Sequence, residues 1–137
     1  MTPRSLIIPF LFSLAGYSTQ ATAAAETETL ASGVVITHTV VGNGPMPTAA
    51  DRVKVHYRGT LLDGTEFDSS YKRNEPAVFP LGGVIRCWTQ GLQKIKVGGK
   101  AKLTCPAATA YGERGAGASV PPNATLNFDV ELLAIEK

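Results

Sequence analysis

A β-hairpin signal between residues 53 and 70 constrains the fold of this chain more than any other feature. Apolar side chains at positions 53, 55 and 57 alternate with Lys, His and Arg, which is the period of a half-buried strand. Asp63 and Gly64 then supply a tight turn, and Phe67 and Asp68 open the return strand. Because Tyr57, Phe67 and one carboxylate fall on paired strands, the hairpin predicts an apolar pocket with a single polar group.

Further strand signals and one helix signal follow along the chain. Ile85, Trp88, Leu92 and Ile95 recur at helical spacing, so residues 84–95 are predicted to form the one amphipathic helix of the domain. Strands are predicted at residues 34–41, 51–60, 66–70, 77–81, 100–106 and 125–135. The pattern indicates an α+β fold, in which an antiparallel sheet buries one face against a short helix.

The N-terminal residues have the features of a secretory signal peptide. Arg4 precedes an apolar run at residues 6–15, and small residues follow at 21–25. The run is too short to cross a bilayer, and Pro9 interrupts it. The alternative is a buried or membrane-anchoring N-terminal helix. We therefore expect a leader at residues 1–25, a short flexible lead-in at 26–32 and one domain at 33–137, with the mature protein in the periplasm or secreted and not in a membrane.

Charge and motif content argue against several classes of function. The formal net charge of +2 gives no case for nucleic-acid binding. His38 and His56 lie in separate predicted strands without the spacing of metal ligands. The glycine-rich residues 112–117 lack the Lys-Ser/Thr ending of a phosphate-binding loop, which argues against a bound nucleotide. From these two observations we expect neither a metal nor a cofactor.

The two cysteines, Cys87 and Cys105, are 18 positions apart. Export would place them in an oxidising compartment, where cysteine pairs often form disulfides. A disulfide across a loop of this size would contribute about 3 kcal/mol to stability. Two buried, reduced thiols acting as small apolar side chains are the other interpretation. Sequence alone leaves both open, because it does not give the distance between the two Cα atoms.

Several separate motifs resemble one known family. In addition to the hairpin, they are Val-Ile-Arg-Cys-Trp at 84–88, Ala-Tyr-Gly at 110–112 and Pro-Pro-Asn-Ala-Thr-Leu-Asn-Phe-Asp-Val-Glu-Leu at 121–132. Together they resemble the FKBP family of peptidyl-prolyl cis-trans isomerases, and most of all its Mip-like bacterial branch. The resemblance covers residues 33–137. It implies a five- or six-stranded antiparallel sheet wrapped around one short helix, with the substrate pocket between them.

The resemblance also implies roles for individual residues. Trp88 would form the pocket floor, while the Tyr111 hydroxyl and the Ile85 backbone N–H would donate hydrogen bonds to the ligand. Asp68 would act as an oriented acceptor paired with Arg73, since no second carboxylate or histidine completes an acid–base pair. The residues implied in catalysis are Tyr57, Phe67, Asp68, Trp88, Tyr111 and Phe128. Those implied in substrate binding around them are Arg73, Phe79, Val84, Ile85 and Val120.

The expected activity is isomerisation of Xaa-Pro bonds in exported proteins, and the expected partners are proline-containing polypeptides. Macrolides such as rapamycin are implied as ligands, although Ala77 and Ser119 replace bulkier family residues and argue against tight binding. Two alternatives are a chaperone-like module that binds unfolded chains with little turnover, and an exported structural domain with a vestigial pocket. We expect a monomer, because only a few residues separate the predicted leader from the first predicted strand.

Overall fold

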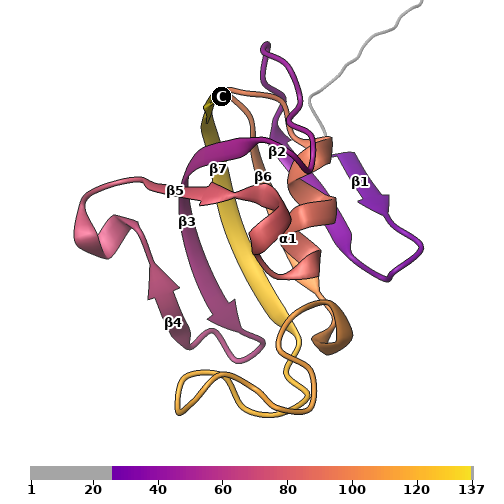
Figure 1. Ribbon diagram of the computed structural model, residues 1–137. Coiled ribbons are helices and arrows are strands. Elements are labelled where there is room, and N and C mark those ends of the chain that lie inside the picture. Colours follow the sequence, from indigo (N-terminus) through magenta and orange to yellow (C-terminus); the bar gives the residue numbers. More distant parts are fainter. Residues whose placement is uncertain (1–25, 137) are drawn as a thin grey trace, which may run out of the picture.

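The computed structural model describes residues 26–136, which form one antiparallel sheet with a short helix against it (Figure 1). The predicted leader at residues 1–25 lies outside this described part. The strands follow the order β1-β2-β6-β7-β3-β4, and β5 also pairs with β3. Their bounds are β1 (Glu26–Thr29), β2 (Val35–Val40), β3 (Arg52–Leu61), β4 (Glu66–Ser69), β5 (Ala77–Pro80), β6 (Lys100–Cys105) and β7 (Leu126–Glu136). Within residues 26–136, no helix is both long and apolar enough to span a membrane.

The predicted α+β class is confirmed, but the sheet has seven strands instead of five or six. The additional strand is β1, which pairs with β2 over Glu26–Thr29, within the segment expected to be a flexible lead-in. Glu28 supports this pairing, because its carboxylate lies 2.8 Å from the Nε2 atom of His38 on β2. Residues of β1 are mostly exposed, so the strand lacks the apolar alternation by which a buried strand is recognised.

The helix is shorter than predicted and begins later. Helix α1 spans Arg86–Gly91, and the 3-10 turn η4 (Leu92–Lys94) continues it. Ile85 precedes the helix with extended backbone angles, and its carbonyl accepts the N–H groups of Trp88 and Thr89. Gly91 allows close packing, because a Cβ atom there would lie 3.0 Å from Leu103 on β6. The predicted apolar face is buried at Trp88, Leu92 and Ile95, whereas Ile85 is only half-buried.

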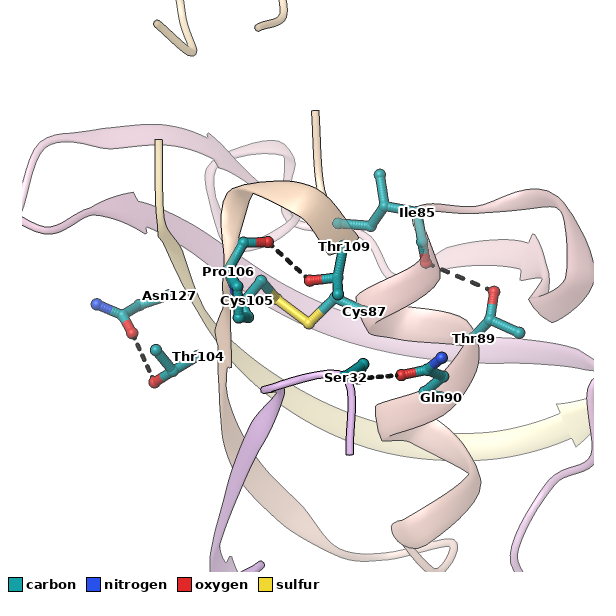
Figure 2. The surroundings of a disulfide bond; sticks show 10 residues. All are labelled: Ser32, Ile85, Cys87, Thr89, Gln90, Thr104, Cys105, Pro106, Thr109 and Asn127. Carbon is teal, nitrogen blue, oxygen red and sulfur yellow. Dashed lines mark hydrogen bonds between the residues drawn. A yellow bond between two sulfur atoms is a disulfide. The ribbon is translucent and has the colours of Figure 1, made fainter. Parts of the chain in front are cut away.

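A disulfide joins the helix to the sheet. Cys87 on α1 is bonded to Cys105 at the end of β6, with the two Cα atoms 5.7 Å apart (Figure 2). Both residues have no solvent exposure. Beyond Cys105 the chain enters the 3-10 turn η5 (Ala107–Thr109), where the Thr109 hydroxyl donates to the Pro106 carbonyl at 2.8 Å. The disulfide therefore fixes the helix directly beside the start of the long β6–β7 connection.

Candidate functional site

A cavity of about 530 Å³ opens where one edge of β3 changes its partner. On that edge, residues 52–55 pair with β5 and residues 58–60 pair with β4. Tyr57 lies between these two paired stretches, and residues 83–85, just before α1, line the cavity as well. The lining residues come from all of these elements and from the β6–β7 connection: Tyr57, Phe67, Asp68, Phe79, Gly83, Val84, Ile85, Trp88, Tyr111 and Phe128.

Trp88 forms the centre of an aromatic cluster at this cavity. Its ring makes edge-to-face contacts with Tyr57, Phe79 and Phe128, at centroid distances of 5.2, 5.4 and 5.3 Å. Phe67 extends the cluster by a similar contact with Phe128 at 5.6 Å. Such pairs stabilise one another by about 0.5–1.5 kcal/mol beyond their burial, so the wall is held in one arrangement. The Trp88 Nε1 atom is buried and has no hydrogen-bond partner in the described part of the chain.

A hydrogen-bonded cluster of three polar side chains lies at one side of the cavity. The Tyr57 hydroxyl donates to Asp68 Oδ2 at 2.6 Å, and Arg73 donates to Asp68 Oδ1 and to the Tyr57 hydroxyl, both at 3.0 Å. Burial disfavours the charged carboxylate, but the hydrogen bonds from Tyr57 and Arg73 outweigh it and lower the pKa of Asp68. Burial and then the bond to Asp68 raise the pKa of Tyr57. Asp68 is thus an ionised acceptor at neutral pH.

Two hydrogen-bond donors at the cavity have no partner among residues 26–136. The Ile85 N–H lies just before the first turn of α1 and donates to no other group there. The Tyr111 side chain is 39% exposed, and its hydroxyl makes no hydrogen bond within the same residues. Because each of these groups can donate a hydrogen bond, both are available to the carbonyl oxygens of a bound ligand.

The structure brings together most of the residues singled out in the sequence. Arg73 does not line the cavity, but it holds Asp68 and Tyr57, which do. Val120 is not among the residues that line the cavity; it is 2% exposed, and its backbone pairs with Ala116. Gly83 lines the cavity and was missed, because a residue without a side chain gives no chemical signal in a sequence.

Comparison with known proteins agrees with this geometry. FkpA of Aeromonas hydrophila, named an FKBP-type peptidyl-prolyl cis-trans isomerase, is 62% identical over 97 residues, covering 71% of this chain and 36% of that protein. FK506-binding protein 1 of Dictyostelium discoideum is 49% identical over 106 residues, covering 76% of this chain and 99% of that protein. The crystal structure of FkpA from Escherichia coli matches with a TM-score of 0.77 and 50% identity, over 80% of this chain and 51% of that one.

The chain spans less than half the length of the first bacterial relatives, with coverage of 36%, 46% and 40%. A sequence model described as FKBP-type peptidyl-prolyl cis-trans isomerase matches residues 44–133, which include every residue that lines the cavity. The chain therefore belongs to the FKBP-type peptidyl-prolyl cis-trans isomerase family.

Proposed function

We propose that this chain accelerates cis–trans isomerisation of Xaa-Pro bonds in proline-containing polypeptides. The observation that carries the proposal is the combination of an aromatic cavity with two donors that have no partner among residues 26–136, the Ile85 N–H and the Tyr111 hydroxyl. A proline ring would occupy the aromatic cup, and the donors would hold the carbonyl groups of the flanking chain. The names of the relatives favour turnover over the alternative of a binding module.

The chemistry needs no covalent step. The barrier to rotation is about 18–20 kcal/mol, because the planar amide loses resonance as the C–N bond twists. A site lowers this barrier when it binds the twisted amide more tightly than either planar isomer. The walls formed by Phe67, Trp88 and Phe128 exclude water from the carbonyl, which favours the less polar, twisted state. Hydrogen bonds to the flanking chain then keep it fixed during rotation.

The cluster of Tyr57, Asp68 and Arg73 acts in this scheme as a fixed polar wall. Its carboxylate is ionised and already accepts hydrogen bonds on both oxygens, so it does not serve as a proton donor. Its role is to orient the Tyr57 ring and to present negative charge beside the twisting amide. We assign the catalytic residues as Tyr57, Phe67, Asp68, Trp88, Tyr111 and Phe128, with Phe79, Val84, Ile85 and Arg73 supporting substrate binding.

Exchange NMR of a short Xaa-Pro peptide tests the proposal directly. We expect the wild type to broaden the cis and trans resonances, and the Phe67→Ala variant to lose about tenfold of this acceleration. Leu62→Ala is the control, because Leu62 is 70% exposed on the β3–β4 turn and does not line the cavity. If the folded wild type bound proline-containing and proline-free unfolded chains without any acceleration, the binding-module alternative would replace the isomerase.

We further propose that residues 1–25 are a leader removed on export to the periplasm or the medium. The basic and apolar pattern of that segment supports this, as does the Cys87–Cys105 disulfide, because disulfides persist in oxidising compartments. Fractionation of a Gram-negative host, with N-terminal mass spectrometry of the recovered protein, would check it. Recovery of uncleaved protein in the cytoplasm would contradict the proposal.

Two finer proposals concern ligands and assembly. The relative named as an FK506-binding protein supports competition between a macrolide such as rapamycin and a proline peptide for the same cavity. Displacement of the peptide by rapamycin, monitored through Trp88 fluorescence, would test this. Residues 26–136 enclose their own hydrophobic core within one sheet, which supports a monomer. Sedimentation equilibrium would contradict a monomer by giving twice the chain mass.

A further inference from the structure

Ser70, the residue that follows β4, makes two backbone contacts with the cavity residue Tyr57. The Tyr57 N–H donates to the Ser70 hydroxyl at 2.7 Å, and the Ser70 N–H donates to the Tyr57 carbonyl at 2.9 Å. Ser70 has no solvent exposure and does not line the cavity. Both polar groups of the Tyr57 backbone on this edge of β3 are therefore held by one buried residue outside the site.

The carbonyl of the same serine holds the segment that carries Arg73. The Arg73 N–H donates to the Ser70 carbonyl at 3.1 Å, within the 3-10 turn η2 (Tyr71–Arg73). The Arg73 guanidinium in turn donates to the Tyr57 hydroxyl at 3.0 Å, and Asp68 lies two residues before Ser70. A closed ring of contacts thus runs from the Tyr57 backbone through Ser70 and Arg73 to the Tyr57 hydroxyl.

His56 fixes the orientation of the Ser70 hydroxyl from the outer side of β3. Its Nδ1 atom lies 2.9 Å from Ser70 Oγ, and its ring stacks on Tyr71 at 4.8 Å with an angle of 15° between the ring planes. Since Ser70 Oγ accepts the Tyr57 N–H, its own hydrogen is free to point at His56, and the alternative acceptor, the Tyr57 carbonyl, is farther away at 3.3 Å. The Tyr57 N–H and His56 Nδ1 together hold the Ser70 hydroxyl in one orientation, since the hydroxyl donates to Nδ1 when that atom carries no proton and accepts from it when it does.

We infer that Ser70 is a positioning residue for the isomerase site, held in place by His56. Without touching the substrate, it sets the position of Tyr57 relative to Asp68 and Arg73, and hence the orientation of the polar wall of the cavity. Enzyme sites lose rate when a supporting contact lets a wall residue move by a fraction of an ångström. The inference rests on the proposed isomerase activity, because it concerns the rate at that cavity.

The first test compares Ser70→Ala with Ser69→Ala. Ser69 is also buried and its hydroxyl also accepts a backbone N–H, at 3.1 Å, but that N–H belongs to Tyr71. We expect Ser70→Ala to lower kcat about tenfold and to change KM less than about twofold, since the aromatic walls remain. The Ser69→Ala variant should stay within about twofold of the wild type in both constants.

A spectroscopic signature separates positioning from a general loss of stability. In protein carrying ¹³Cζ-labelled tyrosine, we expect Ser70→Ala to move the Tyr57 signal and to shift its titration toward the ordinary tyrosine pKa. Ser69→Ala should leave that signal in place. An unchanged Tyr57 signal together with wild-type kcat in folded Ser70→Ala would overturn the inference. An inactive wild type would instead overturn the proposed function, whatever the variants do.

A pair of His56 variants covers the outcome in which Ser70→Ala does not fold. His56→Phe keeps a ring to stack on Tyr71 but removes the Nδ1 atom, whereas His56→Asn restores a side-chain hydrogen-bonding group near the same place. We expect kcat to fall about threefold in His56→Phe and to recover in His56→Asn, with the Tyr57 signal following the same order. Wild-type kcat and an unmoved Tyr57 signal in His56→Phe would contradict the inference.

Discussion

Helix α1 contacts two regions with different properties, which we call its closed face and its open face. On the closed face, Cys87 is bonded to Cys105, and Gly91 lets the helix approach Leu103 closely. Cys87, Cys105 and Leu103 are all fully buried. The open face is the side of Trp88, which borders a cavity of about 530 Å³ with two donors that have no partner among residues 26–136. The residues of the closed face contact only other parts of the protein, whereas the open face borders a cavity that a ligand can occupy. We therefore expect changes on the closed face to alter stability and changes on the open face to alter rate.

The largest expected effect is on the closed face. Replacing both cysteines, as Cys87→Ala with Cys105→Ala, should lower the free energy of unfolding by about 3 kcal/mol, because the 18-residue loop is no longer closed in the unfolded chain. Isomerase activity measured well below the melting temperature should stay within about twofold of the wild type. Urea unfolding measures the expected loss in the free energy of unfolding. A tenfold loss of activity without loss of stability would remove the distinction between the two faces.

The next effect belongs to the open face. Tyr111→Phe removes one donor hydroxyl that has no partner in the described part of the chain, so folding stability should hardly change. The value of kcat/KM for a proline peptide should fall about fivefold, which corresponds to roughly 1 kcal/mol of transition-state binding. Thermal unfolding and exchange NMR on the same sample give both quantities. A destabilised variant with full activity would reverse the assignment of Tyr111.

A smaller effect on stability is expected at Gly91. A methyl group there would lie 3.0 and 3.2 Å from the two Leu103 methyl carbons, and Leu103 is fully buried and cannot move away easily. The cost of overpacking exceeds the gain in helix propensity, so Gly91→Ala should destabilise by about 1 kcal/mol. Activity should be retained, because Gly91 does not line the cavity. Increased stability would show that the closed face is packed less tightly than its distances indicate.

The smallest expected effect is the pH dependence contributed by Asp68. Its pKa in the folded protein lies below the ordinary value of 3.8, so its stabilising contribution is complete above about pH 4 and is lost as the pH falls below that. The carboxylate is 44% exposed, which limits the contribution to less than about 1 kcal/mol. Comparing the pH dependence of unfolding in the wild type and Asp68→Asn isolates it from other carboxylates. If the free energy of unfolding changed with pH equally in the two proteins below pH 4, the assigned contribution of Asp68 would be contradicted.

The elements with one buried face could be predicted from the sequence, and those without one could not. Residues of β3 and β7 alternate between core and solvent, so their strands match the predicted ranges within about one residue. Strand β1 was missed because both of its faces are largely exposed. The helix was predicted to begin two residues too early, because Ile85 continues the apolar spacing although its backbone is extended.

The site was predictable where large side chains carry the signal. Trp88, Phe67 and Phe128 were singled out and do lie together at the cavity. Val120 was included because the family resemblance implied it, but it is not among the lining residues; it is buried, and its backbone pairs with Ala116. Ser70 gave no signal, since its role depends on contacts with Tyr57 and Arg73 that only the fold creates.

One measurement tests the central claim, that the open face of α1 carries the isomerase site. It is the cis–trans exchange rate of one Xaa-Pro peptide, measured with equal amounts of folded wild type, Phe67→Ala and the double cysteine variant. We predict strong acceleration by the wild type and the cysteine variant, and about tenfold less by Phe67→Ala. Equal acceleration by the wild type and Phe67→Ala, or exchange at the uncatalysed rate with all three proteins, would contradict it.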